Sequence, residues 1–113
     1  MISNAAFKKL VMELPEVIEA PHFEHKAYKV KGKIVATHNT QEHRCCVKLS
    51  VQDQSLFCLI NQEMIYPVPN KWGKYGWTLV SLKRVNKEIL RSVLIAAYCN
   101  VAPSKLAQQV IPI

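Results

Sequence analysis

Hydrophobic residues near the start of the chain recur at the spacing of an α-helix. Ser3 or Asn4 can cap this helix, and Pro15 ends it. Its apolar face consists of Phe7, Leu10, Val11 and Leu14. The following segment, residues 15–25, carries three glutamates and two prolines, so we expect an irregular connection there.

Between residues 26 and 50 the apolar period changes to two, which predicts three strands. Residues 31–32 suit a hairpin turn, and the polar residues 38–43 connect the second strand to the third. Val35 is expected to point outward. The expected inward positions are Tyr28, Val30, Ile34, Ala36, Cys45, Val47 and Leu49. The opposite side of this meander then displays five cations, which are Lys29, Lys31, Lys33, Arg44 and Lys48.

The second half of the chain predicts further helices around another pair of strands. Ser50 and Asp53 resemble a capping box at the start of a helix over residues 52–62. The apolar stripe of that helix is Leu56, Phe57, Ile60 and Met64. Asn86 caps a stronger helix, and Pro103 begins a brief last turn. The buried side of the stronger helix is Ile89, Leu90, Val93, Leu94 and Ala97.

Residues 65–82 hold both tryptophans and two of the three glycines. They predict a strand ending at Tyr66, a turn-rich loop over residues 67–76 and a strand over residues 77–82. The loop carries a mixed set of basic and aromatic side chains, Lys71, Trp72, Lys74 and Tyr75. Such a set can hold phosphates and stack on bases. The alternative interpretation is that the tryptophans pack at the end of the sheet and the lysines are merely solvated.

The predicted order is helix, three strands, helix, two strands, helix. This order describes an α+β two-layer sandwich in which helices cover one face of an antiparallel sheet. A chain of 113 residues matches a single domain spanning residues 1–113. No apolar run approaches the roughly 20 residues that cross a bilayer, and the N-terminus lacks a signal-peptide pattern, so we expect a cytoplasmic protein without a membrane role.

The charge balance favours an anionic partner. Fifteen Lys and Arg against eight Asp and Glu give a formal net charge of +7. A small domain with this charge attracts polyanions such as nucleic acid.

The residues of catalytic and metal sites do not occur in recognisable patterns. Four cysteines lack the CxxC spacing of zinc sites, and the pairs His22/His25 and His38/His43 match no metal motif. No nucleophile stands beside a base in a known arrangement, and three glycines form no phosphate loop. We therefore expect no metal, no cofactor and no enzymatic activity.

Three segments carry a family resemblance that spans nearly the full chain. Residues 13–37, ELPEVIEAPHFEHKAYKVKGKIVAT, lead from an acidic, proline-containing stretch into an aromatic strand and then a Gly-Lys-Ile strand. Tyr-Pro at 66–67 precedes Lys-Tyr-Gly-Trp at 74–77, and residues 94–106 end in VAPSKL. In this order the segments resemble the MmcQ/YjbR family of small bacterial proteins.

The resemblance implies an α-β(3)-α-β(2)-α fold, similar to secretion chaperones and loosely to frataxin. It also implies DNA binding by a "double wing" formed by the sheet and its loops. The chain departs from family members that have a His before the tryptophan, because Gly76 stands there. A role of that His does not carry over to this chain.

We accordingly predict a DNA-binding protein of unknown specificity that holds a duplex. The sheet would contact phosphates through Lys29, Lys31, Lys33, Arg44 and Lys48, and the wing would be Lys71, Trp72, Lys74 and Tyr75. The alternative is a chaperone-like or homodimeric protein-interaction module without a nucleic-acid role.

Overall fold

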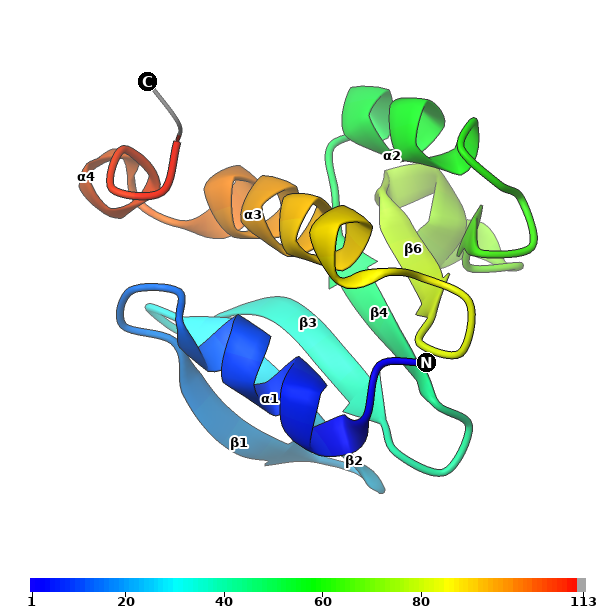
Figure 1. Ribbon diagram of the computed structural model, residues 1–113. Coiled ribbons are helices and arrows are strands. Elements are labelled where there is room, and N and C mark those ends of the chain that lie inside the picture. The colour runs from blue at the N-terminus through cyan, green and yellow to red at the C-terminus, as the bar shows by residue number, and fades with distance from the viewer. Residues whose placement is uncertain (112–113) are drawn as a thin grey trace.

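The computed structural model describes residues 1–111 as helices packed on a six-stranded antiparallel sheet. The elements in chain order are α1 (Asn4–Met12), β1 (Ile18–His22), β2 (His25–Val30), β3 (Lys33–Asn39), β4 (Arg44–Lys48), α2 (Val51–Cys58), β5 (Ile65–Pro67), the 3-10 helix η1 (Lys71–Tyr75), β6 (Trp77–Ser81), α3 (Lys87–Val101) and α4 (Ser104–Ala107). The strand order is β1-β2-β3-β4-β6-β5. Helices α1 and α3 lie on the same side of the sheet, and α2 lies near β6 (Figure 1). The predicted α+β class is confirmed.

The three longest helices begin at the predicted caps. The Ser3 hydroxyl accepts a hydrogen bond from the Ala6 amide at 3.1 Å. The Ser50 hydroxyl accepts a hydrogen bond from the Asp53 amide at 3.1 Å. The Asn86 side-chain oxygen accepts one from the Ile89 amide at 2.8 Å. Each cap satisfies an amide that has no partner within its own helix, which fixes where the helix starts.

The irregular connection expected over residues 15–25 contains a strand instead. β1 pairs with β2 from Ile18↔Lys29 to His22↔His25. β1 is an edge strand with a mostly exposed burial pattern, so it shows no apolar alternation. Pro21 is compatible with it because an edge strand leaves one row of amides unpaired. The sheet therefore has one strand more than predicted.

The hairpin between β2 and β3 follows the prediction at its turn but not along its strands. Lys31 and Gly32 have φ angles of 50° and 82°, as a two-residue hairpin of the mirror-image type requires. The register shifts between Tyr28 and Lys29, which indicates a β-bulge. As a result Val35 is fully buried beside Ala36, and Ile34 is only half-buried. The inward position of Ile34 and the outward position of Val35 were therefore predicted wrongly.

Helix α2 differs from the prediction in length and in buried face. It ends at Cys58 rather than near residue 62. Leu56 and Ile60 are 64% and 51% exposed, whereas the polar Gln54 is buried. The expected apolar stripe thus faces solvent in part, because the side of α2 that faces β5 and η1 carries Gln54.

The core fills the space between the helices and the inner face of the sheet. Phe7 of α1 packs edge-on against Tyr28 of β2, with ring centroids 5.7 Å apart. On α3, Tyr98 is fully buried, and its hydroxyl donates to the carbonyl oxygen of Pro15 at 2.7 Å. No helix within residues 1–111 combines the length and apolar character needed to cross a bilayer.

Candidate nucleic-acid interface

The sheet face opposite α1 and α3, here called the outer face, is defined by the strand register. Residues directly opposite in antiparallel strands point to the same side of the sheet. The pairs Lys29↔Ile34 and Thr37↔Cys46 therefore lie together on the outer face. The outward positions of five strands are Ile18, Ala20, His22, His25, Ala27, Lys29, Ile34, Thr37, Asn39, Arg44, Cys46, Lys48, Trp77, Leu79 and Ser81. They include three cations and no Asp or Glu. This distribution favours an anionic partner on the outer face.

Two projecting segments border a groove on this face. The first wing is the tip of the β1–β2 hairpin, at Phe23, and the second is the loop that contains η1, at Trp72. The groove between them has a volume of about 440 Å³. Its lining is His22, Phe23, Ile34, Thr37, Cys46, Val68, Trp72 and Trp77. The outer face is therefore an apolar groove with cations around it, rather than the surface of five sheet cations that the sequence predicted.

The second wing is held to the body of the protein by Gln54. The Gln54 Nε2 lies 2.9 Å from the carbonyl oxygen of Gly73, 3.2 Å from that of Trp77 and 3.1 Å from the Thr78 hydroxyl. Gly76 ends η1 at a φ of 98°, and a Cβ at that residue would overlap the carbonyl oxygen of Leu49. These contacts give the wing a fixed shape, so its side chains are presented in defined positions.

Three of the five predicted sheet cations lie at outward positions. The Lys29 side chain is half-buried in β2. Lys48 donates from Nζ to the carbonyl oxygen of Tyr75, and its Nζ lies 5.8 Å from the centroid of the Trp77 ring. Arg44 points outward but forms an ion pair with Glu42 at 2.7 Å.

The other two predicted sheet cations do not join this set. Lys31 lies in the hairpin turn, and its Nζ is 2.7 Å from a carboxylate oxygen of Glu16. Lys33 pairs with Val30, whose side chain is in the core, so its position in the register is on the helix-covered side. The hairpin turn and the bulge break the simple alternation that placed all five cations on one face.

The four predicted loop residues lie together on the second wing. All four belong to η1 and are exposed, with Trp72 and Tyr75 at 53% and 62%. The Lys71 Nζ lies 5.5 Å from the centroid of the Trp72 ring, and the rings of Trp72 and Tyr75 are 6.3 Å apart. Trp72 is therefore more exposed than expected for a tryptophan packed at the end of the sheet, whereas Trp77 is half-buried there.

The comparisons with known proteins agree with this fold. A family model described as YjbR matches residues 12–100. The chain belongs to the YjbR family. A search of curated proteins gave no match.

A solved structure similar to this YjbR-family protein is the crystal structure of Deinococcus radiodurans protein DR2400, which contains the domain DUF419. The TM-score is 0.78 at 20% identity, with 96% of this chain and 88% of that chain covered. At that identity the similarity establishes the fold alone.

Residues outside the predicted site also contribute to the groove of this YjbR-family protein. Phe23 and Ile34 were not predicted, because Phe23 was placed in an irregular segment and Ile34 in the core. The signal that could have identified Phe23 is its position between two histidines in a short hairpin, His22-Phe23-Glu24-His25.

The one thiol that lines the groove, within the described residues, is not activated for nucleophilic attack. Burial raises the pKa of the Cys46 thiol to about 11, although a hydrogen bond from the Thr78 backbone and the charge of Arg44 act in the opposite direction. The thiol is therefore protonated at neutral pH and is a poor nucleophile. Within residues 1–111, no three His, Cys, Asp or Glu side chains come close enough to hold a metal ion.

Proposed function

We propose that this YjbR-family protein binds DNA on its outer face without catalysing a reaction. The observation that carries the proposal is the distribution of charge. The outward strand positions hold cations and no carboxylates, and the second wing adds Lys71 and Lys74 beside two exposed aromatic rings. The groove is open between the two wings, so a strand of nucleic acid can reach it.

The cations differ in how readily they can bind phosphate. Within the part of the chain that the structure describes, Lys29, Lys71 and Lys74 form no ion pair. Arg44 must exchange its contact with Glu42, but that pair is partly exposed, and exposed pairs contribute only about 0–1 kcal/mol. Lys48 forms no ion pair there either, and its ammonium keeps two N–H groups besides the one that it donates to the carbonyl oxygen of Tyr75. We therefore assign the main phosphate contacts to Lys29, Lys48, Lys71 and Lys74.

The test is charge reversal on the second wing. The double variant Lys71→Glu/Lys74→Glu is compared with Lys87→Glu/Lys105→Glu, in which the exposed lysines belong to α3 and α4. Both variants lower the formal net charge by four, so they differ only in where the charge is removed. Fluorescence anisotropy with labelled DNA should show at least a roughly tenfold loss of affinity for the wing variant and a smaller loss for the control.

The salt dependence of binding gives a second readout of the same variants. Each lost phosphate contact should reduce the slope of log K against log salt by about one unit. Equal affinities and equal slopes for the two variants would remove the second wing from the interface. Absence of DNA binding by the unaltered protein would refute the proposal as a whole.

We place this activity in the cytoplasm, where DNA is accessible and a reducing environment keeps cysteines as thiols. In keeping with this, Cys45, Cys46, Cys58 and Cys99 are all free.

A second candidate function, a protein-interaction module, is favoured by the exposed face of α2 and the turn that follows it. Four apolar side chains there are more than half exposed, Val51, Leu56, Leu59 and Ile60. Exposed apolar residues that adjoin one another are typical of protein contacts, including contacts between copies of one chain. Analytical ultracentrifugation of the protein and of Leu59→Lys tests self-association. Capture from lysate with and without nuclease then separates a protein partner from one bridged by nucleic acid.

A further inference from the structure

Phe23, at the tip of the first wing, combines high exposure with the positive φ of a two-residue turn between His22 and His25. Its surface is 95% exposed, and its backbone has a φ of 55°. An exposed phenylalanine forgoes hydrophobic burial, and a positive φ is strained for residues other than glycine. The ring of His22 lies edge-on to it, with centroids 5.0 Å apart. Phe23 is thus an exposed aromatic ring that a partner can contact.

Trp72 presents a second exposed ring on the other wing. The Asn70 side chain accepts a hydrogen bond from the Trp72 amide at 2.9 Å, which fixes the start of η1. The charge of Lys71 lies near the indole ring. An aromatic face beside a cation suits a ligand that combines a flat ring with negative charge.

Phe23 and Trp72 border the same groove, although they come from distant parts of the sequence. The volume of about 440 Å³ lies in the range of about 300–1,000 Å³ found for ligand sites. Between the rings, the floor consists mainly of Ile34, Thr37, Cys46 and Trp77. This floor offers apolar area and few hydrogen-bonding groups, so it favours contact with ring faces rather than recognition of base edges.

The bases of a duplex cannot use such a groove, because their faces are stacked on one another inside the helix. Unpaired bases expose their faces, and proteins that bind single strands combine aromatic stacking with a basic path for the backbone. On the outer face that path is supplied by Lys48 and Lys71, which lie close to Trp77 and Trp72. An apolar peptide could fill the groove, but it would leave these cations without a counter-charge.

We propose that the groove between Phe23 and Trp72 binds unpaired bases, so that the protein prefers single-stranded DNA to duplex DNA. This inference rests on the proposed DNA-binding function and specifies the form of DNA that is bound. Because stacking is available to every base, binding should depend little on sequence.

The experiment compares a labelled dT oligonucleotide of about 12 residues, a duplex of the same length and a strand with abasic sites. Anisotropy titrations use the full chain and the variants Phe23→Ser, Trp72→Ser and Trp72→Phe. The control is Met12→Ser, which alters a 40% exposed apolar side chain on α1, away from the outer face. Circular dichroism checks that each variant is folded.

The expected result is at least roughly tenfold tighter binding of the dT strand than of the duplex at equal salt. Phe23→Ser and Trp72→Ser should each weaken that binding by about 5-fold to 150-fold, the range for one stacked base. Trp72→Phe should recover most of the loss, the control should equal the unaltered protein, and the abasic strand should bind weakly.

Two contrary results have different meanings. If the duplex binds as well as the single strand and the Phe23 and Trp72 variants bind normally, the preference for unpaired bases is refuted while DNA binding stands. If neither form of DNA binds, the proposed function fails and this inference fails with it.

Discussion

His38 is a buried histidine whose environment opposes its charge. It is 2% exposed and packs on Phe7, with ring centroids 4.4 Å apart, and its Nε2 has no hydrogen-bond partner within residues 1–111. Burial lowers its pKa, and the nearby charges of Lys26 and His43 lower it further, whereas Glu19 acts in the opposite direction. The neutral imidazole is therefore the form that the folded state accommodates.

This lowered pKa predicts a loss of stability in mild acid. Below about pH 6.5 an unfolded histidine takes up a proton that His38 in the folded state resists. The free energy of unfolding should therefore fall as the pH drops from 7.5 to 5.5, by at most about 1.4 kcal/mol per pH unit from this residue. Urea unfolding at a series of pH values should show a weaker dependence for His38→Gln than for the unaltered protein.

The matched control for this prediction is His22→Gln. His22 lies at an outward position in an edge strand, so its replacement leaves the environment of His38 intact. That variant should keep the pH dependence of the unaltered protein. A profile for His38→Gln that coincides with the unaltered protein would show that His38 does not carry the effect.

At the scale of elements, the second wing depends on a single side chain from α2. Gln54 Nε2 contacts two carbonyl oxygens and the Thr78 hydroxyl, and the same hydroxyl donates to the carbonyl oxygen of Gly76 at 2.9 Å. The cap of α2 at Ser50 places Gln54 one turn into the helix, facing the wing. Helix α2 thus acts as the support of η1.

Replacing Gln54 with Ala should loosen the wing without unfolding the sheet. The change removes one donor from the carbonyl oxygens of Gly73 and Trp77, which keep the amides of Gly76 and Val68. It leaves the buried Thr78 hydroxyl oxygen without a donor, which costs about 1–3 kcal/mol in the free energy of unfolding. Hydrogen exchange measured by mass spectrometry should become faster in residues 68–77 than in β2 and β3. Gln52→Ala, at an exposed position of the same helix, is the control and should leave the exchange unchanged.

The starts of the helices were predicted correctly, whereas β1 and the bulge, which depend on strand pairing, were missed. The caps at Ser3, Ser50 and Asn86 depend on residues three apart, so the pattern is present in the sequence itself. β1 and the bulge opposite Tyr28 arise only when strands pair, and a bulge reverses the side on which later residues point. The groove could not be predicted from the sequence for the same reason. Phe23 and Trp72 line one groove only because the order of the strands in the sheet brings them together.

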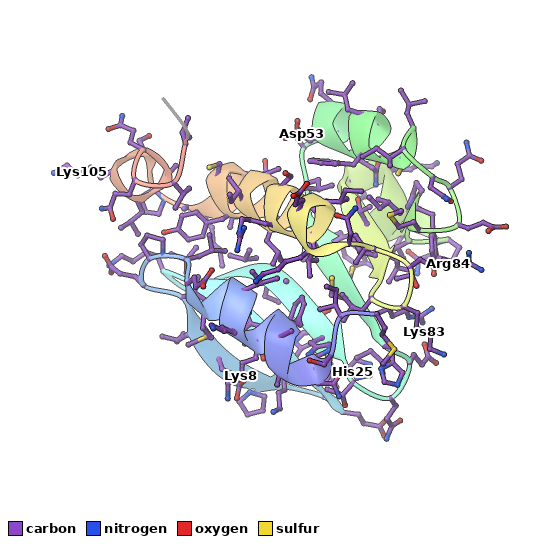
Figure 2. The ribbon with its side chains drawn as sticks, in the orientation of Figure 1. Lys8, His25, Asp53, Lys83, Arg84 and Lys105 are labelled. Carbon is purple, nitrogen blue, oxygen red and sulfur yellow. The ribbon has the colours of Figure 1, made fainter. Side chains whose placement is uncertain are left out.

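At the scale of the whole molecule, positive charge is not confined to the outer face. Lys8, Lys83 and Lys105 project from separate parts of the protein, on α1, after β6 and on α4 (Figure 2). Carboxylates offset some of the charge locally, as in the pairs of Lys8 with Glu19 and of Arg84 with Glu63. The net charge of +7 therefore acts at long range from several sides, whereas the outward strand positions of the outer face carry cations without carboxylates.

This separation predicts that association and dissociation respond differently to charge reversal. Lys71→Glu/Lys74→Glu and Lys87→Glu/Lys105→Glu both reduce the net charge from +7 to +3, so both should slow association with DNA, and more so at low salt. Only the wing variant loses short-range contacts, so only it should dissociate faster, by roughly tenfold or more. Stopped-flow anisotropy at two salt concentrations measures both rates. Equal dissociation rates for the two variants would mean that net charge alone governs binding, and that the lysines of the second wing have no specific part in holding DNA.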